Sequence, residues 1–203
     1  MPHSHTRLAS NQKLLNPIVA RTYTQMAARL FFPLLLVLLV GSHAALASAE
    51  ETCANATEGS NRKDLDAFCV TTLQAAPGSA TADAHGLAVI ATNLTLANYT
   101  AAVATIKGLQ RRGGWSDGQL AALATCRQRY IEALNVVHSA VHALATRQKQ
   151  AYVADMGAVR RAATDCDEAF GANDKEREAS PLRKVNGDAE DLTTVAMLIV
   201  ISL

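Results

Sequence analysis

Residues 118–148, GQLAALATCRQRYIEALNVVHSAVHALATRQ, hold the strongest periodic pattern in the chain and determine the expected fold class. Large apolar residues recur there in a heptad pattern that is interrupted only by Arg127. These residues are Leu120, Leu123, Tyr130, Leu134, Val137, Val141 and Leu144. Because such spacing places one apolar face along a helix, the stretch predicts a long amphipathic helix that packs against other helices.

Similar patterns lie on both sides of this stretch. From Thr81 to about Gln110, apolar residues at steps of three and four form one stripe, which consists of Leu87, Ile90, Leu94, Ala97 and Ala101. Downstream, a second stripe consists of Tyr152, Met156, Val159, Ala163, Cys166 and Phe170. Gly113-Gly114 and Gly118 separate the helix that ends near Gln110 from the one that follows. Ser116 or Asp117 is available to cap this following helix.

The C-terminal part predicts one more helix. Between Gly171 and Gly187 the composition is polar, which indicates a solvated connection. From about Asp188 onward one face is apolar, with Leu192, Val195 and Ile199. This apolar end is shorter than a bilayer requires, so we interpret it as a closing core helix.

Four amphipathic helices with short connections predict an all-α fold, an up-down-up-down four-helix bundle. A cysteine-closed segment from Cys53 to Gln74 precedes it as a helical extension. Aromatic residues make up only 4% of the chain, so we expect alanine to fill much of the interior.

The N-terminus, residues 1–49, has the three parts of a secretory signal peptide. Arg21 and Arg29 precede an apolar core, residues 30–40, and small residues follow at 45–49. Cleavage after Ala47 or Ala49 satisfies the small-residue rule, and Met26 is a possible true start. Residues 50–203 then form one mature domain.

Removal of this leader changes the charge. It takes away four of 19 basic residues and none of the 18 acidic ones, which leaves a formal net charge of −3. A weakly acidic domain has no electrostatic reason to bind nucleic acid. We expect no membrane association after signal cleavage.

All four cysteines, Cys53, Cys69, Cys126 and Cys166, follow the leader. Because export delivers them to an oxidising compartment, an even number predicts disulfides rather than a metal site, although four cysteines permit three pairings. Cys166 falls on the inward stripe, so it can meet Cys126 near the far ends of two antiparallel helices.

Three sequons would be open to glycosylation in the same pathway. Their asparagines are Asn55, Asn93 and Asn98. His138 and His142 share a helix face at i, i+4, but no third metal ligand is evident, so no metal site is predicted. Because histidine changes its charge in mildly acidic solution, the same face is instead a candidate for a pH response.

No Gly-x-Ser-x-Gly elbow, phosphate loop or dinucleotide fingerprint occurs in the chain, so we predict neither an enzyme nor a cofactor. Several short sequence fragments instead follow one another in a characteristic order. They are Cys53, Phe68-Cys69, Leu73, Pro77, Ser79, Ala82-Asp83, Gly86-Leu87-Ala88, Cys126 with Tyr130, Ala162-Ala163-Thr164 with Cys166, Phe170 and Ser180-Pro181-Leu182. In order and spacing the chain resembles the plant invertase and pectin methylesterase inhibitors.

This resemblance implies a secreted four-helix bundle with an N-terminal α-hairpin. It also implies two disulfides, Cys53 with Cys69 and Cys126 with Cys166. Members of the family block a cell-wall or vacuolar enzyme by covering its substrate cleft, and they catalyse nothing themselves. The expected location is therefore the apoplast, with the vacuole as an alternative.

Two targets follow from the resemblance. Pectin methylesterase inhibitors of this type use polar, mostly uncharged positions on the outer faces of the middle helices, and we favour that target. Invertase inhibitors carry Asp-Pro-Lys-Phe at a helix corner, where this chain has Arg147, Lys149 and Tyr152 in a different spacing.

These three residues are the candidate target-binding residues. The alternative for the two basic side chains is a solvated corner that complements a helix C-terminus. In a different class of function, the bundle would be an extracellular structural protein or a carrier of a small ligand.

Overall fold

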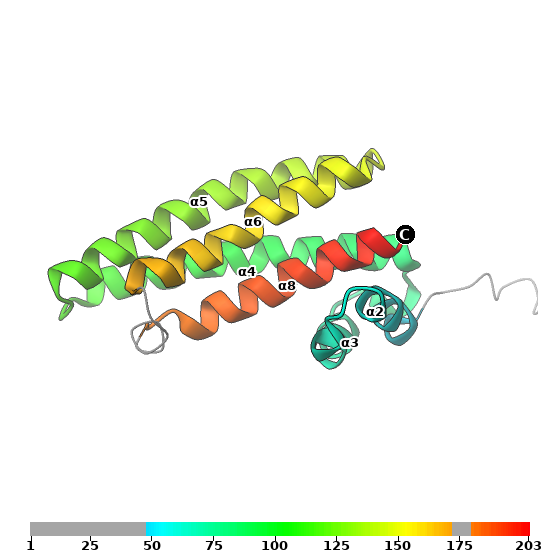
Figure 1. Ribbon diagram of the computed structural model, residues 1–203, viewed down its shortest axis with the longest axis horizontal. Coiled ribbons are helices and arrows are strands. Elements are labelled where there is room, and N and C mark those ends of the chain that lie inside the picture. Colours follow the sequence, from blue (N-terminus) through cyan, green and yellow to red (C-terminus); the bar gives the residue numbers. More distant parts are fainter. Residues whose placement is uncertain (1–47, 172–179) are drawn as a thin grey trace, which may run out of the picture. The chain divides into compact units, whose positions relative to one another are not determined.

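The structure is a computed structural model that describes residues 48–171 and 180–203. Every regular element within these ranges is helical (Figure 1). The elements are α2 (Ala49–Glu58), η1 (Lys63–Leu65), α3 (Asp66–Gln74), η2 (Ser79–Thr81), α4 (Ala84–Arg112), α5 (Asp117–Ala145), α6 (Lys149–Phe170) and α8 (Arg183–Ser202). The predicted signal peptide lies outside the described residues except for Ser48 and Ala49.

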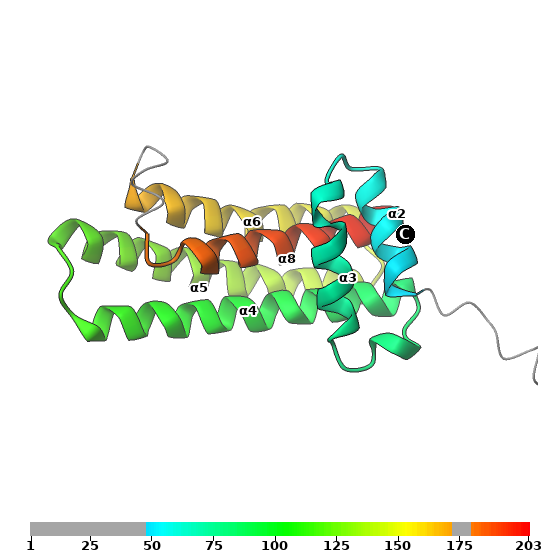
Figure 2. The same ribbon diagram turned by 90° about the horizontal axis from the view of Figure 1, so that it is seen from below.

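The four long helices form a closed bundle. Helix α5 packs most extensively on α6, α6 packs on α8, α8 on α4, and α4 on α5 (Figures 1 and 2). Consecutive helices run in opposite directions, as the short connections require. The all-α, up-down-up-down prediction is therefore confirmed.

Helices α2 and α3 form the N-terminal hairpin, which lies against α8 and the start of α4, on the side away from α5 (Figures 1 and 2). The Ser48 side chain caps α2 by accepting a hydrogen bond from the Glu51 backbone N–H at 3.1 Å. Arg62 fastens the hairpin to the bundle through Asp191 of α8, at 3.7 Å. Burial raises the pKa of Asp191, although Arg62 opposes that shift.

Two disulfides lock these units, as predicted. Cys53 of α2 is bonded to Cys69 of α3, with their Cα atoms 5.8 Å apart. Cys126 of α5 is bonded to Cys166 of α6, with a Cα–Cα distance of 4.5 Å. All four sulfur-bearing residues are fully buried. One crosslink therefore closes the hairpin and the other joins two bundle helices.

The buried face of α4 differs from the predicted stripe. Ala97 and Ala101 are exposed, whereas Thr92, Thr95 and Tyr99 are buried. The hydroxyls of these residues are satisfied inside the bundle: Thr92 and Thr95 bond to carbonyls four residues earlier, at 2.7 and 3.0 Å. The prediction was wrong because it counted alanine as core and threonine as surface.

Helix α5 follows the predicted pattern only in part. Ser116 is its N-cap and forms a capping box with Gln119. Leu120 and Val141, which the heptad pattern placed inside, are 39% and 37% exposed. The helix packs against both α4 and α6, so alanines complete its buried face. They are Ala122, Ala133, Ala140 and Ala143.

Helix α8 begins at Arg183, five residues before the predicted start at Asp188. The prediction treated Asn186 and Gly187 as part of a solvated connection, yet Asn186 is 1% exposed. Within the described ranges α4 alone is long and apolar enough to cross a membrane, and 44% of that apolar stretch is buried against the rest of the bundle.

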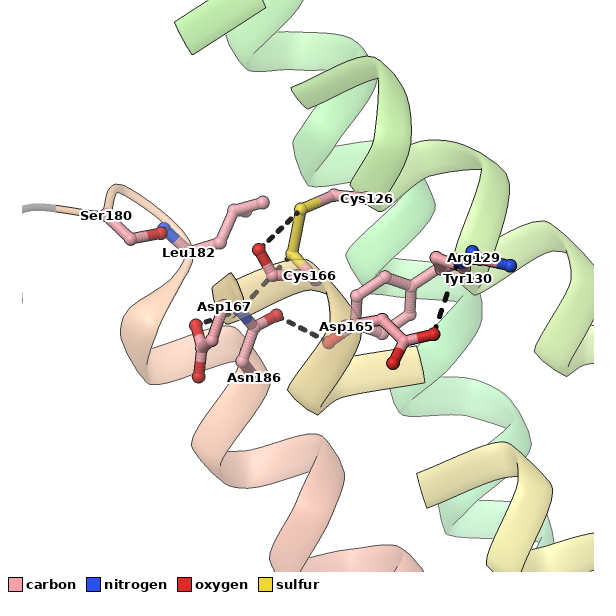
Figure 3. Close-up of a disulfide and its surroundings, with 9 residues drawn as sticks. All are labelled: Cys126, Arg129, Tyr130, Asp165, Cys166, Asp167, Ser180, Leu182 and Asn186. Carbon is pink, nitrogen blue, oxygen red and sulfur yellow. Dashed lines mark hydrogen bonds and ion pairs between the residues drawn. A yellow bond between two sulfur atoms is a disulfide. The ribbon is translucent and has the colours of Figure 1, made fainter. Parts of the chain in front are cut away.

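A buried polar network surrounds the second disulfide (Figure 3). The Tyr130 hydroxyl of α5 donates to Oδ1 of Asn186 in α8 at 2.7 Å. The Asn186 side-chain amide donates to Sγ of Cys166 at 3.3 Å and to the Asp167 carboxylate. Three helices are thus tied together through one asparagine, and burial raises the pKa of Tyr130.

Helix α4 joins this network through Tyr99. Its hydroxyl donates to the Val159 carbonyl of α6 at 3.0 Å and lies 3.1 Å from Oγ1 of Thr193 in α8. The rings of Tyr99 and Tyr130 have centroids 5.0 Å apart. Burial raises the pKa of Tyr99 to about 12. The core therefore contains an oriented set of hydroxyls as well as apolar packing.

Candidate functional site

The turn from α5 to α6 holds an exposed arginine in an unusual backbone conformation. The Arg147 N–H donates to the Leu144 carbonyl at 3.1 Å, and the Gln148 N–H donates to the Ala143 carbonyl at 2.8 Å. This pair of bonds is a Schellman motif, in which glycine usually occupies the position of Arg147. Arg147 has φ = 57°, in the left-handed region. Its side chain is exposed at the end of the bundle.

Lys149, the second predicted target-binding residue, is exposed and has a structural bond. Its Nζ donates to the carbonyl of Ile201 at 2.6 Å, in the last turn of α8. A cation at this place complements the partial negative charge of a helix C-terminus. For Lys149 the structure therefore agrees with the alternative of a basic corner that serves a helix end.

Tyr152, the third predicted residue, does not reach the surface. It is fully buried, and its hydroxyl lies 2.7 Å from Oγ1 of Thr92 in α4. Burial raises its pKa to about 12. The expectation that Tyr152 contacts a target was wrong. Tyr152 is close in sequence to the basic corner, but it belongs to the apolar stripe of α6 that faces the core, so its side chain points inward.

Arg147, Lys149 and their neighbours surround a pocket of about 180 Å³ at this end of the bundle. Its lining residues are His85, Ala143, Leu144, Arg147, Gln148, Lys149, Tyr152, Val200 and Leu203. They come from the first turns of α4 and α6, the last turns of α5 and α8, the turn between α5 and α6, and the residue that follows α8. The corner therefore combines an apolar floor with basic side chains at the rim.

The outer face of α5 and α6 offers a second surface. A groove of about 490 Å³ lies between these helices near the second disulfide. Arg129 of α5 and Asp165 of α6 form an ion pair across it at 3.3 Å (Figure 3). The sequence analysis missed this pair, whose members are far apart in the chain. Only the Cys126–Cys166 bond, which lies beside both residues, could have indicated it.

The remaining predicted residues are distributed over the surface. His138 and His142 are exposed on α5. No cluster of three or more potential metal ligands occurs among the residues that the structure describes. Asn55 of α2 and Asn93 of α4 are exposed, while Asn98 is half-buried and its Oδ1 has no hydrogen-bond partner.

Comparison with known proteins gives a consistent result. Residues 47–199 match the family described as plant invertase/pectin methylesterase inhibitor. A curated protein of Platanus acerifolia named "Putative invertase inhibitor" is 28% identical over 169 residues, which cover 83% of this chain and 91% of that protein.

Solved structures show a similar fold. The crystal structure of mutant form A of a pectin methylesterase inhibitor from Arabidopsis aligns with a TM-score of 0.56 at 19% identity, over 67% of this chain and 88% of that one. A second inhibitor structure, from Arabidopsis thaliana, gives 0.50 at 18% identity, over 67% and 87%.

Proposed function

The chain belongs to the plant invertase and pectin methylesterase inhibitor family, and on that premise we propose that it is a secreted inhibitor of pectin methylesterase. It acts by forming a 1:1 complex that occludes the substrate cleft. The family consists of enzyme inhibitors, so the chain is an inhibitor and not an enzyme. Its target is pectin methylesterase or invertase.

The observation that carries this proposal is the open outer face of α5 and α6. The hairpin lies against the other side of the bundle, so it leaves α5 uncovered (Figures 1 and 2). Helix α5 has 29 residues and is about 43 Å long, so it offers an extended surface to a target. Its exposed residues are mostly uncharged; they include Gln128, Ile131, Asn135 and Ser139.

The positions of the three sequons are consistent with binding of the enzyme to the outer face of α5 and α6. We propose glycans at Asn55, Asn93 and Asn98, which belong to α2 and α4. Sugars on these two helices would leave the outer face of α5 and α6 free for an enzyme. We also propose that residues 1–49 are a signal peptide and that the protein acts in the cell wall or, as an alternative, the vacuole.

The decisive experiment titrates the secreted mature protein against purified pectin methylesterases and acid invertases at several pH values. We expect loss of esterase activity with an end point of one inhibitor per enzyme. If neither class loses activity, the function is wrong, and a carrier or structural role replaces it. If only invertase is inhibited, the choice of target is wrong.

A glycan placed on α5 tests the face itself. Ser139→Asn with Val141→Thr creates a sequon at two exposed positions, so the fold should be retained. We expect the glycosylated variant to lose esterase inhibition. The matched control, Ser139→Gln with Val141→Thr, has the same surface polarity without a sequon and should inhibit normally. Full inhibition by the glycosylated variant would show that the enzyme binds elsewhere.

Acid invertase is the second candidate, and Arg147 favours it. Among the described residues the guanidinium has no ion-pair partner. Glycosidases of this kind depend on two carboxyl groups, with which an exposed arginine could pair. Arg147→Gln should then abolish invertase inhibition and leave esterase inhibition intact. Equal inhibition of invertase by the variant and the original protein would exclude this role for Arg147.

A further inference from the structure

The pocket at the end of the bundle has the size of a small-molecule site. Its volume of about 180 Å³ is close to the roughly 150 Å³ of an engineered apolar cavity that binds benzene. The apolar part of its wall comes from helices α5, α6 and α8 and from the residue after α8; it consists of Ala143, Leu144, Tyr152, Val200 and Leu203. One six-membered ring or a short aliphatic chain therefore fits.

The rim of this pocket is basic. Arg147 and Lys149 are exposed at its mouth, and the half-buried His85 lies beside them, with Nε2 3.4 Å from the Leu144 carbonyl. None of the nine lining side chains carries a carboxylate. Lys149 uses one of its three N–H groups for Ile201, whereas the five donors of the Arg147 guanidinium meet no partner among the described residues. An anionic group at the mouth would therefore meet charge-assisted donors.

We propose that this pocket binds a small organic acid that combines one carboxylate with one aromatic ring or short aliphatic chain. The apolar part lies against Leu144 and Val200, and the carboxylate pairs with Arg147. A sugar acid such as galacturonate fits poorly, because its hydroxyls would be buried against an apolar wall without partners. This binding depends on the pocket alone and not on the proposed function.

A consequence for regulation does depend on that function. Since the ligand would neutralise Arg147, it should compete with any target enzyme that uses this corner. An acid of this kind would then release invertase but not an esterase that is held on the outer face of α5 and α6.

Benzoate is the probe that tests the site. Titration of the oxidised mature protein at pH 6, followed by amide chemical shifts in NMR, should move signals of residues 143–149 and 199–203 and of His85. Benzyl alcohol, which lacks the charge, and acetate, which lacks the ring, should bind at least about tenfold more weakly. Absence of shifts at 10 mM benzoate, or equal binding of benzyl alcohol, acetate or galacturonate, would overturn the proposal.

Variants separate the two halves of the ligand. Arg147→Gln should weaken benzoate binding at least about tenfold, whereas Arg161→Gln, at an exposed position on α6, should change nothing. Leu203→Ser alters a wall residue that is 52% exposed, so it should reduce benzoate binding without unfolding the core. Unchanged binding in Arg147→Gln would refute the proposal. Because no enzyme is present, this result is independent of the inhibition assays.

Discussion

At Arg147 the chain keeps a long basic side chain in a backbone conformation that glycine occupies more easily. The left-handed conformation costs a non-glycine residue about 1–2 kcal/mol. A residue held in such a conformation suggests a function for its side chain. The strain at Arg147 is therefore consistent with its exposure at the rim of the pocket and with its proposed role.

The first prediction concerns this strain. Arg147→Gly should raise the free energy of unfolding by about 0.5–1 kcal/mol, because relief of strain exceeds the added flexibility of the unfolded chain. Arg147→Gln removes the same charge but keeps the strained conformation, so its stability should stay near that of the original protein. Urea denaturation measures both. A glycine variant that is less stable than the glutamine variant would contradict the strain argument.

Asn186 is the residue on which the buried network depends. Asn186→Ala leaves the Tyr130 hydroxyl buried without its partner, so we expect a loss of about 1–3 kcal/mol in stability. In a double-mutant cycle, adding Tyr130→Phe should recover part of this loss. Thr164→Ala, at an exposed position on α6, serves as the control. Strictly additive losses would mean that the two side chains are not coupled.

At the scale of the helices, the sequence predicted which segments fold and how they connect, because helical periodicity is strong over long runs. It did not predict correctly which residues of a helix are buried, or where every helix begins. Ala97 was assigned to the core and Tyr99 was not, since burial of a hydroxyl depends on a partner from another helix. The start of α8 was missed because Asn186 looked like a loop residue until Tyr130 was placed beside it.

The candidate site was predictable to a similar extent. Arg147 and Lys149 were placed correctly at a helix corner, since the ends of α5 and α6 follow from the pattern. Tyr152 was assigned to both the core stripe and the target-binding set, and only the packed structure decides between them. The pocket could not be foreseen, because the turn between α5 and α6 meets His85 of α4 and Val200 of α8, which are distant in sequence.

The two disulfides join different pairs of helices, so the contribution of each one to stability can be predicted separately. Replacing Cys53 and Cys69 with alanine opens a loop of 16 residues and should lower stability by about 3 kcal/mol. The same change at Cys126 and Cys166 opens a loop of 40 residues and should cost about 4 kcal/mol. Urea unfolding of the two double variants gives this order. A larger loss from the hairpin pair would mean that strain or packing outweighs chain entropy.

Across the whole molecule, every tyrosine of the described chain is part of the core: Tyr99, Tyr130 and Tyr152 are fully buried. Their side chains come from α4, α5 and α6, so together they report on the packing of the bundle. Burial raises the pKa of all three, to about 12 for Tyr99 and Tyr152.

Alkaline titration tests this arrangement. The folded state holds the phenolic protons more tightly than the unfolded state, so their contribution to stability is complete below pH 10 and is lost as the pH rises toward 12. At pH 11 the folded protein should therefore show less tyrosinate absorbance at 295 nm than the chain unfolded in guanidinium. Identical absorbance in a protein that keeps its helical circular dichroism would contradict the burial of these hydroxyls.

The cap of the first described helix makes the exact processing point matter. A peptidase that cuts after Ala47 leaves Ser48 in place to hold the start of α2, whereas a cut after Ala49 removes both the cap and a buried alanine. Loss of such a cap costs about 0.5–2 kcal/mol. Two mature forms that differ by two residues would thus fray differently at the hairpin, and trimming of Ser48 alone by an aminopeptidase would already remove the cap from the longer form.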